Sequence, residues 1–288
     1  MRLRNLVIFT LILISTIGCI NTYESALAQH EEQSALGDDK ATYKLALHYL
    51  GKYPIGENYL IGHNEIDYKK SANYLKLLSE KDHAEATYIL ASLYANHYYV
   101  NDDNYLSTRS RCDAVDIINQ TTSTPFKKCF WTPSDDLKII VNNEYHALIN
   151  KAAGLGHTKA LIQKSKDNPD CSITIPSLKV AAFENGSLEA ATRLGIIYQS
   201  LYSGEFYDLK LALKMFNIVE EHINQATMEG IQLQSIVNTY KSTITRTMKN
   251  SRSVKSNNDL VEIARSRNFH DCQAEFNRIP ALNNLFGA

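Results

Sequence analysis

Apolar residues along this chain recur at a spacing that predicts helices. From Ala41, apolar side chains stand at offsets 0, 4, 5 and 8 in the stretch ATYKLALHYLG, and the matching stretch ATYILASLYAN begins at Ala86. A third copy of the pattern begins at Ala190. Since an α-helix has about 3.6 residues per turn, offsets 0, 4 and 8 lie on one face of it. The three copies therefore predict three equivalent amphipathic helices.

The residues at offset 5 of these helices are small. They are Ala46, Ala91 and Gly195, and a small side chain lets a neighbouring helix approach closely. A tyrosine at offset 8 supplies apolar area and a polar tip. We therefore expect the three small residues to lie at helix–helix contacts.

A second apolar stripe, with the spacing i, i+1 and i+4, predicts a partner for each of these helices. Its copies are Tyr74, Leu75 and Leu78, then Leu148, Ile149 and Ala152, then Met215, Phe216 and Val219. Asp67 and Asp208 precede two of the stripes and suit helix N-caps. Gly156 and Gly186 stand where a tight turn between helices is needed. The predicted unit is helix, turn, helix, which buries its apolar face only against neighbouring units.

Two segments, NKAAGLGHTKA at 150–160 and DLKLALKMF at 208–216, resemble the Sel-one-like repeat family, a relative of the tetratricopeptide repeats. The resemblance covers residues 24–225. It implies an all-α fold, an α/α solenoid of helix-turn-helix repeats, and members of the family typically serve as protein-binding scaffolds. Residues 226–288 are expected to form a helical cap, because an open solenoid end would expose an apolar face.

The repeat spacing is irregular. Equivalent alanines stand at 41, 86, 160 and 190, so the gaps are 45, 74 and 30 residues. The long gap predicts an insertion, at residues 101–136, and the short gap a shortened repeat. Extended backwards, the same frame makes residues 24–34 the second helix of a leading half-repeat.

The N-terminus has the outline of a signal peptide. Arg2 and Arg4 precede a largely apolar stretch of twelve residues, 6–17, which is too short to span a bilayer. Thr16-Ile17-Gly18-Cys19 resembles a bacterial lipobox, which would make residues 1–18 the leader and Cys19 an acylated N-terminus. Ile20 after the cysteine suggests the outer membrane.

A second cleavage site competes with the lipobox. Ala26-Leu27-Ala28 is an A-x-A site of the kind that ordinary signal peptidase cuts. A cut after Ala28 would sever the predicted leading half-repeat, which favours the lipobox. Both sites remain open at the level of sequence.

Four further cysteines would be exposed to an oxidising compartment, where disulfides are the usual state. Four cysteines permit three pairings. We predict Cys112 with Cys129 because they are close in sequence, and Cys171 with Cys272 by elimination.

The insertion carries the candidate partner-binding residues. Phe126 lies in the loop that Cys112 and Cys129 bracket, and Phe130 and the only tryptophan, Trp131, follow Cys129 directly. Aromatic anchors dominate the energetics of many interfaces. The alternative is a local lid whose aromatic side chains fold onto the solenoid.

Charge and motifs exclude several functions. The net charge of -1 gives no overall positive field that would attract nucleic acid. A run of five basic residues extends from Lys241 to Lys255. We interpret it as a solvated face, or as a contact for anionic lipid or an acidic partner. The chain has no H-E-x-x-H, G-x-S-x-G, phosphate-binding glycine loop or C-x-x-C. Scattered histidines such as His48, His83 and His157 are expected to be structural or exposed. No catalytic residue, cofactor or metal is predicted.

The sequence therefore predicts a periplasm-facing, lipid-anchored envelope protein that binds another protein and is not an enzyme. Resemblance to exported repeat lipoproteins implies a narrower role, that of an immunity protein which neutralises a periplasmic toxin. An envelope-assembly scaffold is an alternative, as is a cell-wall-related hydrolase. Repeat proteins assigned such hydrolysis carry a cysteine pair in nearly every repeat, whereas residues 41–94 contain no cysteine.

Overall fold

The computed structural model describes residues 23–53, 55, 66–95, 110–115, 126–131, 135–250, 272 and 285. Its described elements are helices, apart from one β-hairpin. The chain divides into two compact units, Met1–Leu148 and Ile149–Ala288. Each unit has a buried core of its own.

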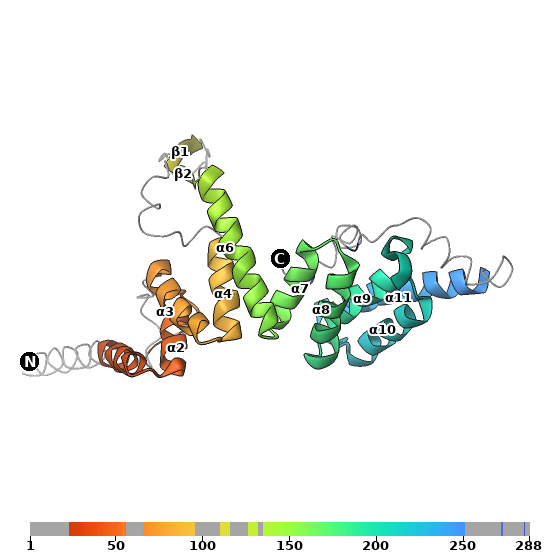
Figure 1. Ribbon diagram of the computed structural model, residues 1–288, viewed down its shortest axis with the longest axis horizontal. Coiled ribbons are helices and arrows are strands. Elements are labelled where there is room, and N and C mark those ends of the chain that lie inside the picture. Colours follow the sequence, from red (N-terminus) through yellow and green to blue (C-terminus); the bar gives the residue numbers. More distant parts are fainter. Residues whose placement is uncertain are drawn as a thin grey trace, which may run out of the picture. The chain divides into compact units, whose positions relative to one another are not determined.

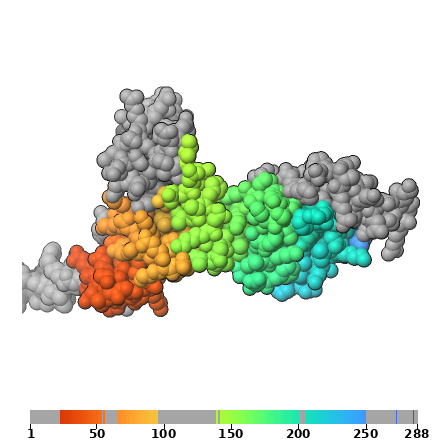
Figure 2. All heavy atoms as spheres, in the orientation of Figure 1, coloured from red at the N-terminus to blue at the C-terminus, as the bar shows by residue number. Residues whose placement is uncertain are grey.

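Unit 1 is a row of helices that pack on their neighbours in sequence (Figure 1). A helix over residues 23–35 is followed by α2 (Asp39–Tyr49), α3 (Tyr68–Glu80) and α4 (Ala84–Ala95). Figure 2 shows the atoms of α2 to α4 as an unbroken block that changes colour in chain order. The core between these helices consists of Ala46, Ala72, Leu75, Leu78, Ala86, Leu90 and Leu93.

Unit 2 repeats this arrangement, since α7 contacts α8, α8 contacts α9, α9 contacts α10 and α10 contacts α11. Contacts between successive helices are the pattern of an α/α solenoid, so the predicted fold class is confirmed. Its elements are α7 (Thr158–Asp167), α8 (Cys171–Lys179), the π-helix η1 (Val180–Glu184), α9 (Leu188–Gln199), the 3-10 helix η2 (Leu201–Phe206), α10 (Leu209–His222) and α11 (Met228–Asn250).

The first helix of each repeat, α2, α4, α7 or α9, begins with the same turn. One residue of the turn has a positive φ, and these residues are Gly37, Asp82, Gly156 and Gly186. The side chain of the next residue accepts a hydrogen bond from the backbone N–H of the alanine three residues later, and these capping residues are Asp38, His83, His157 and Ser187. The four alanines are those found equivalent in the sequence, and all are buried.

The second helix of a hairpin begins with an aspartate cap in both units. The N–H of Asp67 donates to the carbonyl of Tyr49 at 2.9 Å, and the N–H of Asp208 donates to the carbonyl of Tyr198 at 2.7 Å. Each aspartate side chain then accepts from backbone N–H groups of the helix that it starts. Both predicted N-caps are confirmed.

The small residues at offset 5 lie at helix contacts, as expected. Ala46 and Ala91 are fully buried. A Cβ atom at Gly195 would lie 2.8 Å from Cζ of Phe216, so α9 and α10 are as close as a glycine allows. In unit 1, the hydroxyl of Ser71 in α3 donates to the carbonyl of Ala46, the residue equivalent to Gly195, at 2.9 Å.

The structure adds two strands to the predicted insertion at residues 101–136. Within the described residues it contains the antiparallel strands β1 (Ser110–Val115) and β2 (Phe126–Trp131), and α6 (Asp135–Gly154) follows. The helix α11, which ends at Asn250, is the described part of the predicted cap over residues 226–288. The rest of that cap, apart from residues 272 and 285, lies outside the described residues.

Candidate functional site

The insertion hairpin is the candidate that the sequence singled out. Its register places Cys112 directly opposite Cys129. Residues that face each other in an antiparallel pair have Cα atoms about 4.5 to 5.5 Å apart, which lies within the range that a disulfide bridges. The predicted Cys112–Cys129 bond therefore agrees with the backbone and stays a prediction.

The strand register divides the three aromatic candidates. Along β2, Phe126 and Phe130 are four residues apart and fall on one face of the ribbon, whereas Trp131 falls on the other. Val115 and Arg111 stand opposite the two phenylalanines. By this alternation the phenylalanine pair and Trp131 take register positions on opposite faces of the ribbon.

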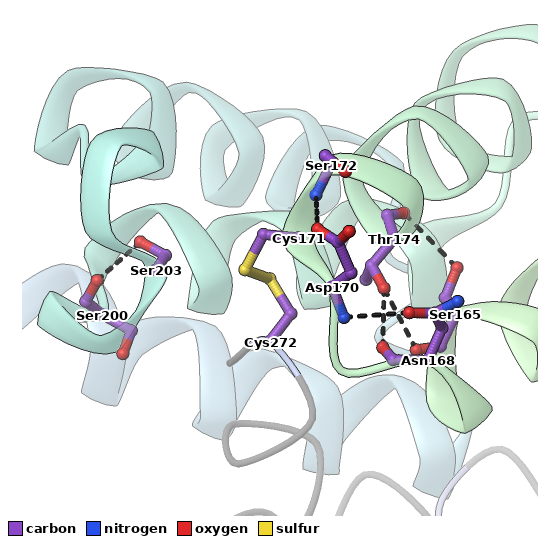
Figure 3. Close-up of a disulfide and its surroundings, with 9 residues drawn as sticks. All are labelled: Ser165, Asn168, Asp170, Cys171, Ser172, Thr174, Ser200, Ser203 and Cys272. Carbon is purple, nitrogen blue, oxygen red and sulfur yellow. Dashed lines mark hydrogen bonds between the residues drawn. A yellow bond between two sulfur atoms is a disulfide. The ribbon is translucent and has the colours of Figure 1, made fainter. Parts of the chain in front are cut away.

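The second predicted disulfide, between Cys171 and Cys272, is present (Figure 3). It joins the first residue of α8 to a residue 101 positions later, and both cysteines are fully buried. The N–H of Cys272 also donates to the carbonyl of Pro169 at 2.8 Å. Because its sulfur is bonded and buried, Cys272 is not a nucleophile in this state.

A polar turn surrounds this disulfide (Figure 3). Asp170 caps α8 by accepting from the N–H of Ser172 at 2.8 Å, and its own N–H donates to Oδ1 of Asn168 at 2.9 Å. The hydroxyl of Thr174 donates to the carbonyl of Asn168 at 2.9 Å. Every one of these bonds fixes the chain entering α8, so the site is structural.

Unit 2 also contains a group of three charges between α7 and α9, of which Arg193 is buried and Lys166 and Glu189 are partly buried. Nη2 of Arg193, whose side chain is 3% exposed, lies 2.8 Å from Oε1 of Glu189, and Nζ of Lys166 lies 3.8 Å from the same oxygen. Burial lowers the pKa of Arg193, which Glu189 opposes. Burial and then the Arg193 charge lower the pKa of Lys166. Glu189 thus holds two cations and ties α7 to α9.

Unit 1 contains a buried histidine with both ring nitrogens engaged. Nδ1 of His48 lies 3.1 Å from the carbonyl of Tyr53, and Nε2 lies 2.9 Å from the hydroxyl of Tyr23. A carbonyl only accepts, so Nδ1 carries the proton and Nε2 accepts from the hydroxyl. His48 joins the helix over 23–35 to α2, and neither nitrogen is available to a metal ion. The expectation of a structural role is confirmed for this residue.

Next to the contact that His48 makes between the helix over 23–35 and α2, two tyrosines join α2 to α3. The rings of Tyr49 and Tyr74 stack with centroids 6.0 Å apart, and Nζ of Lys70 lies 4.9 Å from the centroid of Tyr49. The hydroxyl of Tyr49 donates to Glu31 at 3.3 Å. Burial, and secondarily the charge of Glu31, raises the pKa of Tyr49 above its ordinary value.

An exposed apolar surface on α8 and η1 was not anticipated from the sequence. Phe183 is 54% exposed and Ile173 is 40% exposed, and Pro176 between them is exposed as well. These three apolar residues belong to neither of the predicted apolar stripes, and this could have indicated in the sequence that they are exposed.

Other kinds of site are not seen in the part of the chain that the structure describes. It contains no group of three or more His, Cys, Asp or Glu side chains able to hold a metal ion. Among the described helices, none is long and apolar enough to span a bilayer. Comparison of the chain with models of known protein families and with curated proteins finds no match.

Proposed function

We propose that this protein is an exported, lipid-anchored helical-repeat protein whose function is to bind another protein. The observation that carries the proposal is the repeated unit itself, in which four equivalent capped turns each start a helix at a buried alanine. Stacked helical hairpins create extended surfaces that suit a folded partner or a peptide.

The conspicuous polar groups of both units serve the fold. His48 has both nitrogens bonded, Glu189 is held by two cations, and Cys171 is bonded to Cys272. Because this imidazole, this carboxylate and these two sulfur atoms are already bonded within the fold, we favour a binding function over a catalytic one. Turnover of cell-wall substrates by the purified protein would contradict the proposal.

The insertion hairpin is the proposed contact with the partner. Its aromatic residues are brought onto a short ribbon by the β1–β2 register. An isolated two-stranded ribbon is marginally stable, so the predicted Cys112–Cys129 bond would hold the aromatic residues in place. Among possible partners we favour a periplasmic toxin, with the protein as its immunity partner, over a component of an envelope-assembly complex.

The test is affinity capture of the exported chain from envelope extract, followed by reassembly of the complex from purified components. We expect a stoichiometric partner, and a toxin encoded by the adjacent gene would favour the immunity role. Trp131→Ala should weaken the complex by about 2 kcal/mol or more, as hot-spot aromatics do.

A matched variant identifies the face that binds. Phe130→Ala changes the neighbouring residue on the opposite face of the ribbon. Loss of affinity in Trp131→Ala alone would place the partner on the Trp131 face. Unchanged affinity in both variants would remove the hairpin from the interface and leave it as a lid.

A further inference from the structure

The imidazole of His83 caps the start of α4. Its Nδ1 atom lies 3.2 Å from the backbone nitrogen of Ala86, which donates the hydrogen bond. The backbone N–H of Thr87 donates to the carbonyl of His83 at 3.0 Å, so the helical bonding begins at this residue. His157 accepts in the same way from the N–H of Ala160 at the start of α7. In each unit, one of the two capping residues described above is thus a histidine.

This bond fixes where the His83 ring carries its proton. A backbone N–H only donates, so Nδ1 of His83 is unprotonated, and in the neutral ring Nε2 carries the proton. A second proton on Nδ1 would place its N–H against the N–H of Ala86 and break the cap. It would also place a positive charge at the N-terminus of α4, where the helix dipole disfavours a cation. The cap therefore requires a neutral imidazole.

Charged and titratable groups surround His83 on three elements. Among the described residues they come from α2, from the turn between α3 and α4, and from α4 itself, and they are Tyr43, Asp39, Lys81, Asp82 and Glu85. Asp39 and Lys81 form an ion pair with each other, so their charges largely cancel at the ring. Asp82 and Glu85 are exposed and lie one and two positions from His83 in sequence. They stay near the ring in the unfolded chain, so their attraction for an imidazolium acts in both states.

Tyr43 is the remaining group, and its ring stacks on the imidazole with centroids 5.1 Å apart. Burial, and secondarily the charge of Glu85, raises the pKa of Tyr43, so the phenol stays uncharged in neutral and acidic solution. An aromatic ring at a partly exposed position attracts an imidazolium weakly. That attraction is smaller than the combined cost of a lost cap and a cation at a helix N-terminus. The stacked ring therefore does not replace the hydrogen bond that a second proton would break.

We propose that His83 is an acid-sensitive cap, which holds the start of α4 at neutral pH and releases it when the ring takes up a second proton. Free histidine side chains bind this proton below about pH 6.5. The unfolded chain binds it without loss, whereas the folded chain binds it only by giving up the cap. The stability that the cap contributes is therefore fully present well above that pH and is lost as the pH falls through and below it.

The released turn leads directly into the core of unit 1. Ala86 is fully buried, and it lies in the same cluster as Leu75 of α3 and Leu90 of α4. Fraying at the start of α4 therefore loosens its packing on α3. Acid thus acts on the hairpin formed by α3 and α4, while a helix capped by a serine does not respond.

The first test is hydrogen exchange of the full chain, followed by NMR at about pH 7.5 and about pH 5.5, on either side of the range in which histidine changes its charge. After correction for intrinsic exchange rates, the Ala86 amide should lose protection about fivefold at the lower pH, which corresponds to a typical cap. The Ala190 amide is the internal control, because it donates to the hydroxyl of Ser187, a group that does not titrate. No change at Ala86, or an equal change at both amides, would overturn the proposal.

A substitution isolates the titrating group. His83→Ser introduces the cap that Ser187 supplies in unit 2, so the variant should keep its cap at both pH values. Its thermal midpoint should fall less on acidification than that of the wild type, by about 2 to 4 °C. A fall as large as that of the wild type would contradict the proposal.

His222 offers a matched control. Its Nδ1 lies 2.8 Å from the carbonyl of Ile218 in the last turn of α10, so this nitrogen donates. A second proton on Nε2 keeps that bond and adds a positive charge at a helix C-terminus, where it is favourable. His222→Ser should therefore give no relief from the acid loss, and relief equal to that of His83→Ser would refute a specific role for the cap.

The ring itself gives a readout that needs no variant. Long-range nitrogen NMR of the wild-type chain at neutral pH should show His83 with an unprotonated Nδ1 and a protonated Nε2. A proton on Nδ1 would overturn the proposal even if the chain lost stability in acid.

Discussion

At the scale of single residues, Gly154 and Gly156 stand two positions apart but differ in backbone conformation. Gly156 has φ of +82°, and Gly154 lies in the last turn of α6 without a positive φ. A Cβ atom added at either position would meet no heavy atom within 4 Å, so sterics with neighbours do not distinguish them. The backbone angle alone decides the effect of a side chain.

We therefore expect Gly156→Ala to destabilise the protein by about 1 kcal/mol, because a side chain is strained in the left-handed region. Gly154→Ala should stabilise it by about 0.5 to 1 kcal/mol through helix propensity. Denaturant unfolding of both variants measures the two changes. The same sign in both would refute the assignment of the turn.

The residue scale also shows which caps the sequence can reveal. Asp67 and Asp208 were predicted because aspartate is a strong N-cap. His83 and His157 cap α4 and α7 through Nδ1, and this was missed because histidine is not a usual capping residue. Each histidine directly follows the residue of the turn that has a positive φ, Asp82 or Gly156. This shared position in the repeat could have identified the two histidines as N-caps.

At the scale of elements, the contact between α9 and α10 depends on one glycine. The Phe216 ring fills the space over Gly195, which leaves no room for a Cβ atom. The corresponding pair in unit 1 is Ala46 with Leu75, both in one buried cluster. In unit 2 the smaller residue is a glycine and the larger one a phenylalanine, whereas in unit 1 they are an alanine and a leucine.

Gly195→Ala should destabilise the protein by about 1 to 3 kcal/mol, the usual cost of overpacking a core. Phe216→Leu in the same chain recreates the unit 1 pair and should recover part of the loss. A double-mutant cycle by denaturant unfolding measures the coupling. Simple additivity of the two changes would show that the residues do not share a contact.

Elements with a repeated apolar pattern could be predicted from the sequence, and the others could not. The helices α2, α4 and α9 share the spacing that begins at an alanine, and their partners α3 and α10 share a second stripe. The strands β1 and β2 occur once, so no repeat elsewhere in the chain marks them or their register. The π-helix η1 depends on a shift in backbone bonding, such as the Asn185 N–H donating to the carbonyl of Val180, that no residue type specifies.

At the scale of the whole molecule, cysteine pairing was partly predictable. Cys171 and Cys272 were paired by elimination, and the disulfide is present. No local pattern links them, since 101 positions separate them. The register of Cys112 and Cys129 agrees with their proximity in sequence. The division of the aromatic residues between two ribbon faces required the strand register, which the sequence does not specify.

Buried and partly buried tyrosines in both units give the stability of the molecule a pH dependence. Burial is the largest cause that raises the pKa values of five tyrosines above the ordinary 10.0, and they are Tyr43, Tyr49, Tyr74, Tyr198 and Tyr207. Above that pH the unfolded chain releases protons that the folded chain keeps. The stability that these groups contribute is fully present below about pH 10 and is lost as pH rises through their folded pKa values. Lys166 acts in the opposite sense, because its pKa is lowered in the fold.

Among the residues that the structure describes, the five tyrosines with a raised pKa outnumber the one lysine with a lowered pKa, so we expect the free energy of unfolding to fall between about pH 10 and about pH 11. Denaturant unfolding at several pH values measures the slope. Tyr49→Phe keeps the ring against Tyr74 and removes one titrating hydroxyl, so the variant should lose less stability than the wild type over the same interval. A wild-type stability that stays level, or an equal slope in the variant, would show that these hydroxyls are as well solvated in the fold as in the unfolded chain.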